Sequence, residues 1–134
     1  MRTVLTVGVY DLLHYGHFEL FRRARELAGE GGKLIVAVQR DDVVAKYKPS
    51  AELVYNWDIR VRMIRALRWV DDVVPYDDVD GCVKKIAFDV FVVGGDQPHA
   101  GFCRAIDWCR ANGKEVVRLE RTQGISSSEL RERQ

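Results

Sequence analysis

The stretch 3-TVLTVGVYDLLHYGHFELFRRARELA-28 contains the change from strand to helix that decides the fold. Residues 3–7 form a short apolar run that predicts a buried strand, and Gly8 ends it. From Gly16 onward, apolar residues recur at helical spacing, while arginines and glutamates fall on the opposite face. The predicted order is therefore a strand, a loop that carries two histidines, and a helix.

The rest of the chain repeats this alternation of strand and helix. Short apolar runs predict four further strands, at residues 33–39, 71–76, 89–95 and 115–120. Amphipathic spacing predicts helices at residues 57–70, 79–88, 102–114 and 126–134. Glycines stop two of the helices, at residues 29–32 and at Gly113. The segment 41–57 is polar and mixed, and Pro49 predicts a break within it.

This alternation predicts an α/β fold with a mainly parallel, five-stranded sheet. Parallel neighbours require crossover connections, and the connecting helices then cover both faces of the sheet. We therefore expect a Rossmann-like three-layer sandwich formed by one domain, residues 1–134. In such sheets ligands bind beyond the carboxyl ends of the strands. Three loops fall there: residues 8–17, 94–99 and 121–128.

Composition and charge exclude several classes of protein. The formal net charge of +1 argues against a large nucleic-acid surface, which needs a basic excess. No apolar stretch reaches the roughly 20 residues of a membrane-spanning helix, and the N-terminal residues lack a signal-peptide pattern. The three cysteines, Cys82, Cys103 and Cys109, show no CxxC spacing, which favours a reduced, cytoplasmic setting.

The two histidines of the first loop, His14 and His17, are three positions apart at the expected start of the helix. Residues at this spacing are neighbours, and a helix N-terminus with its free amides favours anions. Gly16 lets a phosphate approach the backbone, and Asp11 is placed to cap the helix or to orient a histidine. The alternative is structural: His14 caps the helix locally and His17 packs against the sheet. A zinc site is disfavoured because no third ligand is near.

A second loop, 121-RTQGISSSEL-130, has similar features. It follows a predicted strand, contains a glycine, and opens the last predicted helix with three serines. Ser126 and Glu129 have the spacing of a capping box, which by itself is a common structural feature. Two helix starts of this kind at one edge of a sheet favour binding of phosphate groups.

The segments "GVYDLLHYGH" and "RTQGISSS" together resemble the cytidylyltransferases of the HxGH nucleotidyltransferase superfamily, most closely the small glycerol-3-phosphate cytidylyltransferases. The segments "LIVAVQRDD", "KYK", "IRVRMIRALRWVDDVVP" and "DVFVVGGD" follow in the order of that family. The resemblance implies a fold of the HUP/nucleotidyltransferase type. It also implies transfer of CMP from CTP to a small phosphorylated alcohol, with glycerol 3-phosphate as the first expectation, giving a CDP-alcohol and pyrophosphate.

The resemblance implies roles for individual residues. The expected catalytic residues are His14, His17, Lys46 and Arg121, and the expected acceptor-binding residues are Lys46, Lys48 and Arg60. With the two histidines, the expected nucleotide-binding residues are Gly8, Val9, Tyr10, Asp11, Gly16, Asp96, Arg121, Thr122, Gly124, Ile125, Ser126, Ser127 and Ser128. Mg²⁺ is expected to bind with the nucleotide phosphates. The family also implies a cytoplasmic homodimer that serves cell-wall or capsule polysaccharide synthesis.

Two departures from the family pattern concern the substrates. Tyr10 stands where the family usually has phenylalanine, and "GDQPHAGF", residues 95–102, replaces the usual continuation of the acceptor loop. Other acceptors therefore stay open, among them phosphocholine and phosphoethanolamine. An ATP-using adenylyltransferase that acts on a sugar phosphate or FMN, and a nucleotide-binding module without chemistry, are the alternatives. A Rossmann dehydrogenase is disfavoured because the glycines at 29–32 follow a helix and not a strand.

Overall fold

The computed structural model describes residues 2–10, 13–47, 55–94 and 100–119, without the side chains of 45–47 and 100–101. Within these residues the sheet has five strands in the order β3-β2-β1-β4-β5, and every pair is parallel. The strands are β1 Thr3–Gly8, β2 Lys33–Gln39, β3 Asp72–Tyr76, β4 Val90–Gly94 and β5 Glu115–Leu119. The helices are α1 Tyr15–Ala28, α2 Asp41–Tyr47, α3 Trp57–Arg65, α4 Val79–Lys85 and α5 Ala100–Ala111. The predicted Rossmann-like α/β sandwich is confirmed.

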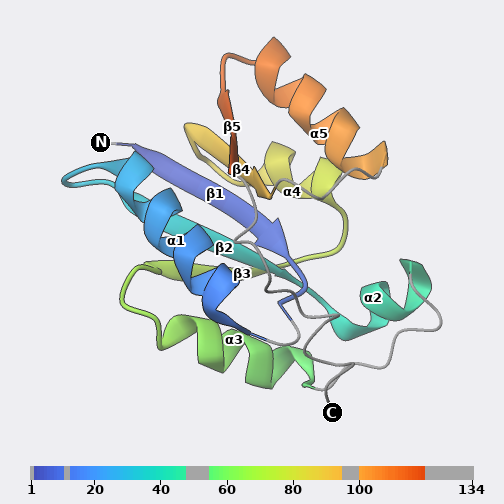
Figure 1. Cartoon of the computed structure of the whole chain (residues 1–134). Coiled ribbons are helices and arrows are strands. Elements are labelled where there is room, and N and C mark those ends of the chain that lie inside the picture. The colour runs from blue at the N-terminus through green and yellow to red at the C-terminus, as the bar shows by residue number, and fades with distance from the viewer. Residues whose placement is uncertain (1, 11–12, 48–54, 95–99, 120–134) are drawn as a thin grey trace.

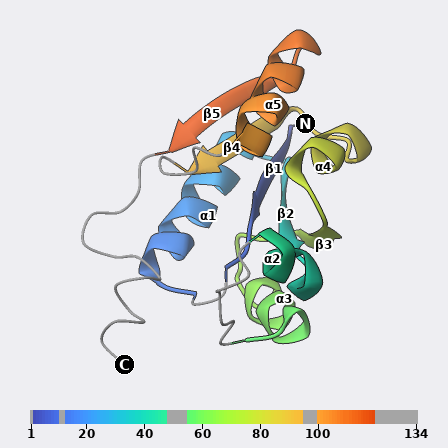
Figure 2. The same ribbon diagram turned by 90° about the vertical axis from the view of Figure 1, so that its right-hand side faces the viewer.

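Helices cover both faces of the sheet and divide the core in two. Side chains of α1 and α3 pack on one face, around Phe21 and Ile64. Side chains of α4 and α5 pack on the other face, around Val83 and Ile106. Figures 1 and 2 show α1 and α4 on opposite sides of the central strands. The central strands are buried from both sides, which explains why they are continuous apolar runs.

The structure differs from the sequence prediction most at two helices. Helices α4 and α5 also end before their predicted ends, at Lys85 and Ala111, and the helix predicted over 126–134 lies outside the described residues. Residues 41–47, for which no helix was predicted, form α2. Asp41 and Asp42 lie in its first turn, where the helix dipole stabilises carboxylates. The helix predicted over 57–70 ends at Arg65, because the chain must turn there to enter β3. Asp71 holds that turn: its N–H donates to the Leu34 carbonyl at 3.0 Å, and its carboxylate accepts from the Leu34 N–H at 2.8 Å.

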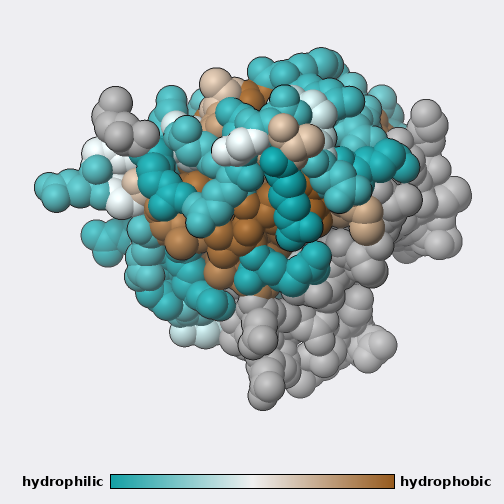
Figure 3. Space-filling view, turned by 90° about the horizontal axis from the view of Figure 1, so that it is seen from above, coloured by the Kyte–Doolittle hydropathy of each residue, from teal (hydrophilic) through white to brown (hydrophobic). Residues whose placement is uncertain are grey.

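Among the described helices, α1 covers only part of the sheet on its side. Helix α1 packs against β1, β2 and β4, while β5 lies at the edge of the sheet. Val117 of β5 is accordingly only partly buried against the core on this side. Seen from above, the molecule has an apolar area surrounded by hydrophilic side chains (Figure 3). In the described ranges no helix has the length and apolar character needed to cross a bilayer.

Candidate active site

The strand order reverses between β1 and β4. From β1 the chain proceeds to β2 and β3 on one side, and β4 and β5 extend the sheet on the other side. Beyond the carboxyl ends of two such neighbouring strands the connections diverge and leave a crevice. Strand β1 ends at Gly8 and the two histidines follow it, so the histidine loop lies at this reversal point.

The two histidines form the N-terminal cap of α1. The N–H of Gly16 donates to Nδ1 of His14 at 3.0 Å, and the N–H of His14 donates to Nδ1 of His17 at 3.2 Å. This reciprocal pattern is a capping box built from imidazoles, with His14 as the N-cap. The two rings stack with their centroids 3.9 Å apart. The structural alternative for His14 is therefore confirmed, because His14 caps the helix.

The cap determines where each imidazole carries its proton. A neutral imidazole has one donor nitrogen and one acceptor nitrogen, and in both rings Nδ1 is the acceptor. The proton of each neutral ring is therefore assigned to Nε2. Burial, and to a smaller extent the charge of His14, lowers the pKa of His17 to about 3. At neutral pH His17 is consequently a neutral hydrogen-bond donor at the positive end of a helix dipole.

Tyr10 packs its ring against His17 and has an unusual backbone conformation. Its φ of 53° lies in the left-handed region, and its ring folds back over the end of β1. A Cβ at Gly8 would lie 2.6 Å from Cζ of Tyr10, so only glycine leaves room for the ring. The ring meets His17 edge-on at 5.3 Å between centroids, and Phe21 lies 5.2 Å away on the same ring. Gly8 and Tyr10, expected to line the nucleotide, thus also hold a histidine in place.

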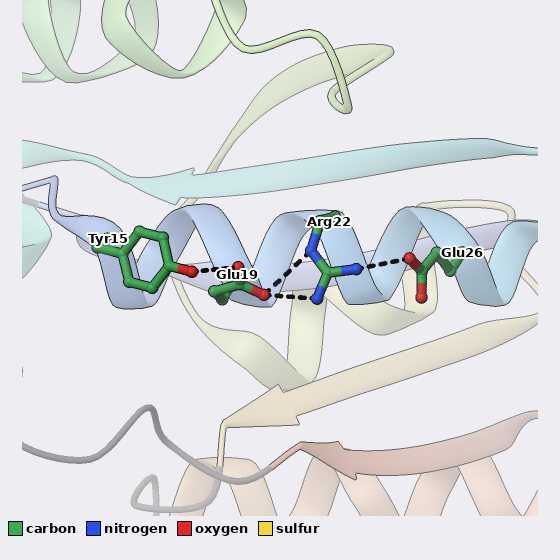
Figure 4. Close-up of polar contacts among 4 residues, drawn as sticks. All are labelled: Tyr15, Glu19, Arg22 and Glu26. Carbon is green, nitrogen blue, oxygen red and sulfur yellow. Dashed lines mark hydrogen bonds and ion pairs between the residues drawn. The ribbon is translucent and has the colours of Figure 1, made fainter.

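A polar ladder runs along the exposed face of α1 from the cap toward its C-terminus (Figure 4). The hydroxyl of Tyr15, the first residue of the helix, donates to Glu19 at 2.7 Å. Arg22 binds Glu19 at 2.6 Å and Glu26 at 2.7 Å. Solvent screens these exposed pairs, so they contribute little to the stability of the helix. The ladder nevertheless holds the exposed Tyr15 ring along the helix through its bond to Glu19.

Arg60 is buried and belongs to a hydrogen-bond network that joins four segments at the same edge of the sheet. Its Nη1 donates to the Val9 carbonyl at 2.7 Å and its Nη2 to Asp41 at 2.5 Å. Asp41 also accepts the N–H of Trp57 at 3.0 Å, and the Trp57 indole donates to the Val38 carbonyl at 3.1 Å. No sequence motif points to Asp41. Its position directly after β2, at the carboxyl edge, was the available signal.

Comparison with known proteins identifies the family of the chain. The model of the Cytidylyltransferase-like family matches residues 5–133. The chain belongs to this family. It is similar to the glycerol-3-phosphate cytidylyltransferase of Staphylococcus aureus, at 40% identity over 136 residues that cover 98% of this chain and 94% of that protein. It is also similar to the FAD synthase of Korarchaeum cryptofilum, at 36% identity over 132 residues that cover 96% and 88%.

Among solved structures, the chain is similar to a lipopolysaccharide core biosynthesis protein from Thermoplasma volcanium. The TM-score is 0.71 at 23% identity, and the match covers 91% of this chain and 97% of that one. This likeness supports the shared fold. The family match, and not this likeness, makes the chain a cytidylyltransferase-like nucleotidyltransferase, and the family implies a nucleoside triphosphate and a phosphorylated acceptor as substrates.

In this cytidylyltransferase-like chain the structure brings part of the predicted site together. The residues gathered around the start of α1 are Gly8, Val9, Tyr10, His14, Gly16 and His17, with Arg60 beneath them. Lys46 belongs to α2, and its side chain lies outside the described residues. Also outside them are Asp11, Lys48, Asp96, Arg121, Thr122, Gly124, Ile125, Ser126, Ser127 and Ser128.

The described residues do not form a metal cage. They contain no group of three or more histidine, cysteine, aspartate or glutamate side chains that could hold a metal ion. Both Nδ1 atoms of the histidine pair are engaged in the helix cap. While the cap is formed, these two nitrogens are therefore not available as metal ligands.

Proposed function

We propose that this protein is a cytidylyltransferase that transfers CMP from CTP to glycerol 3-phosphate. An oxygen of the acceptor's phosphate forms a bond to the α-phosphorus of CTP. The bond from that phosphorus to the oxygen bridging to the β-phosphorus breaks, and its electron pair leaves with pyrophosphate. The products are CDP-glycerol and pyrophosphate. The support is the sequence pattern "RTQGISSS" and the similarity to a glycerol-3-phosphate cytidylyltransferase over nearly the whole chain.

The observation that carries the proposal is the histidine capping box at the reversal point of the sheet. The nucleophile is a phosphate monoester that is already mostly ionised at pH 7, with a second pKa near about 6, so no general base is needed. The reaction requires alignment of two anions and stabilisation of the charge that develops on the leaving pyrophosphate. The Nε2–H donors of His14 and His17, at the positive end of the helix dipole, are suited to that charge.

Other residues enter the proposal from the sequence. Lys46 and Arg121 are proposed to bind phosphate oxygens, and Lys48 to bind the acceptor. Asp11 and Asp96 are proposed to contact the nucleotide, with residues 121–128 around the cytidine side. Mg²⁺ bound with the triphosphate would neutralise part of its charge.

Pyrophosphate release tests the proposal directly. The purified protein is assayed with CTP or ATP against glycerol 3-phosphate, phosphocholine, phosphoethanolamine and FMN. We expect turnover with CTP and glycerol 3-phosphate. The variants His14→Asn and His14→Ala separate the two roles of the cap. Asparagine is a good N-cap, but its side chain is shorter and cannot replace the Nε2–H donor.

Both His14 variants are expected to lose about 10²-fold or more in turnover, the usual cost of removing a donor to developing charge. Only His14→Ala should also lose about 1 kcal/mol of stability, because only alanine removes the cap. Turnover of His14→Asn close to that of the parent protein would contradict the proposed role of the imidazole.

An ATP-using adenylyltransferase is the second candidate, and one observation favours it. The FAD synthase of Korarchaeum cryptofilum is 36% identical to this chain, and its product contains an adenylyl group. Turnover with ATP and FMN that exceeds turnover with CTP would select this function. Binding of CTP without pyrophosphate release from any acceptor would indicate a binding module.

A further inference from the structure

The guanidinium of Arg60 is less accessible to a phosphate from solvent than the carboxylate of its partner Asp41. The Arg60 side chain is 0% exposed, whereas its partner Asp41 is 42% exposed. An anion that approaches this network from solvent therefore meets the Asp41 carboxylate before the guanidinium. Two like charges at short range repel each other, so this arrangement disfavours direct binding of the acceptor's phosphate by Arg60.

The hydrogen bond from Arg60 instead acts on the histidine loop. Its Nη1 donates to the Val9 carbonyl at 2.7 Å, and that carbonyl belongs to the peptide group between Val9 and Tyr10. The orientation of this peptide plane is what the φ angle of Tyr10 describes. That angle is 53°, in a region that tyrosine rarely adopts without support from its surroundings.

Tyr10 transmits this orientation to His17. Its buried ring lies over Gly8 and contacts the His17 ring edge-on, with an interplanar angle of 87°. Among the described residues the rings in contact with His17 are those of His14 and Tyr10. A change in the orientation of the Val9–Tyr10 peptide therefore moves the Tyr10 ring, which contacts His17.

We propose that Arg60 is a positioning residue, which fixes His17 through the Val9–Tyr10 peptide and does not bind the acceptor. Asp41 holds Arg60 in this position. Its carboxylate accepts hydrogen bonds from Nη2 of Arg60 and from the N–H of Trp57 at the start of α3. The kinetic consequence rests on the proposed function. The structural consequence, a change in the environment of His17, does not.

The test compares Arg60→Met with Arg62→Met. Methionine keeps much of the apolar volume but removes the guanidinium. Arg62 lies on the same helix, its side chain is 77% exposed and it pairs with Asp58 of that helix, so it is a matched control. In Arg60→Met we expect kcat to fall about 10²-fold, the cost of misplacing a catalytic group by about 1 Å, with KM for glycerol 3-phosphate unchanged. Arg62→Met should match the parent protein in both constants.

A second readout needs no substrate. The ring of His17 is followed by ¹⁵N NMR from pH 8 to pH 5 in each protein. In the parent protein and in Arg62→Met we expect it to stay neutral. In Arg60→Met we expect it to gain a proton within this range, because its midpoint moves toward the ordinary value of about 6.5. If the parent protein releases no pyrophosphate, the proposed function fails, and this titration still decides the role of Arg60.

The variant Asp41→Asn keeps Arg60 and is expected to disturb the fold less than Arg60→Met does. If Arg60 positions His17, weakening its anchor lowers kcat and leaves KM for glycerol 3-phosphate unchanged. If Arg60 binds the acceptor, releasing it from the carboxylate lowers that KM. The inference is overturned by a lower KM in Asp41→Asn. It is also overturned by a raised KM in Arg60→Met with kcat and the His17 titration unchanged.

Discussion

Lowering the pH from 7 to 5 is expected to destabilise the protein by up to about 2 kcal/mol through His17. The pKa of this ring is about 3 in the folded protein, because burial and the neighbouring His14 disfavour its charge. In the unfolded chain it returns to about 6.5. Between these two values the unfolded state binds a proton that the folded state does not. Stability is therefore fully present above pH 6.5 and is lost as the pH falls toward 3.

The magnitude follows from proton linkage. At pH 5 the unfolded ring is almost fully protonated and the folded ring is almost fully neutral, which costs about 2 kcal/mol. At pH 7 the same difference is only about 0.2 kcal/mol. The loss amounts to a large fraction of the stability of an ordinary domain of this size, which is about 5–15 kcal/mol.

Urea unfolding followed by circular dichroism at pH 7, 6 and 5 measures this effect. The matched variant is His17→Gln, whose side-chain oxygen can still accept the N–H of His14 in the capping box but does not titrate. The carboxylates and the other histidines are common to both proteins, so their contributions cancel in the difference to a first approximation. We expect the parent protein to lose up to about 2 kcal/mol more than the variant between pH 7 and pH 5. Equal losses in the two proteins would refute the reasoning.

Two further substitutions test the supports of the site and of the sheet. Gly8→Ala places a Cβ 2.6 Å from Cζ of the Tyr10 ring and should lower the free energy of unfolding, measured in urea, by about 1–3 kcal/mol. Adding Tyr10→Leu should remove most of this cost. If the costs of the two substitutions simply add, the clash with the ring is excluded. Asp71→Ala leaves the buried N–H of Leu34 without its carboxylate partner and should cost about 1–3 kcal/mol. Asp77→Ala, which breaks only a 3.6 Å surface pair, should cost less than about 0.5 kcal/mol, so equal melting shifts for these two variants would contradict the assignment.

The parallel sheet was predictable because its signal is local and strong. Residues 34–38 are all buried, so the strand is an unbroken apolar run that needs no alternation to be recognised. Helix α2 was not predictable from its pattern, because seven residues are too few to show an amphipathic period. Its first residue, Asp41, is held by Trp57 and Arg60, and these contacts form only in the folded chain.

The same distinction applies to the site. The pairing of His14 and His17 follows from their spacing, because residues three apart at a helix start are neighbours. The link from Arg60 to Val9 spans 51 residues, and no local pattern contains it. The need for glycine at position 8 arises from the left-handed Tyr10 two residues later, which only the folded loop reveals.

The cap and the proposed phosphate contact are compatible because imidazole has two nitrogens with different tasks. Serine, asparagine or aspartate would cap α1 equally well, since each offers an acceptor to a first-turn N–H. An aspartate, however, would place a negative charge where a triphosphate is proposed to bind. A neutral histidine accepts through Nδ1 and still has a donor at Nε2, without the cost of burying a charge. The structural role of the pair therefore prepares its chemical role, because the hydrogen bonds that start the helix also assign the protons that the proposed reaction needs.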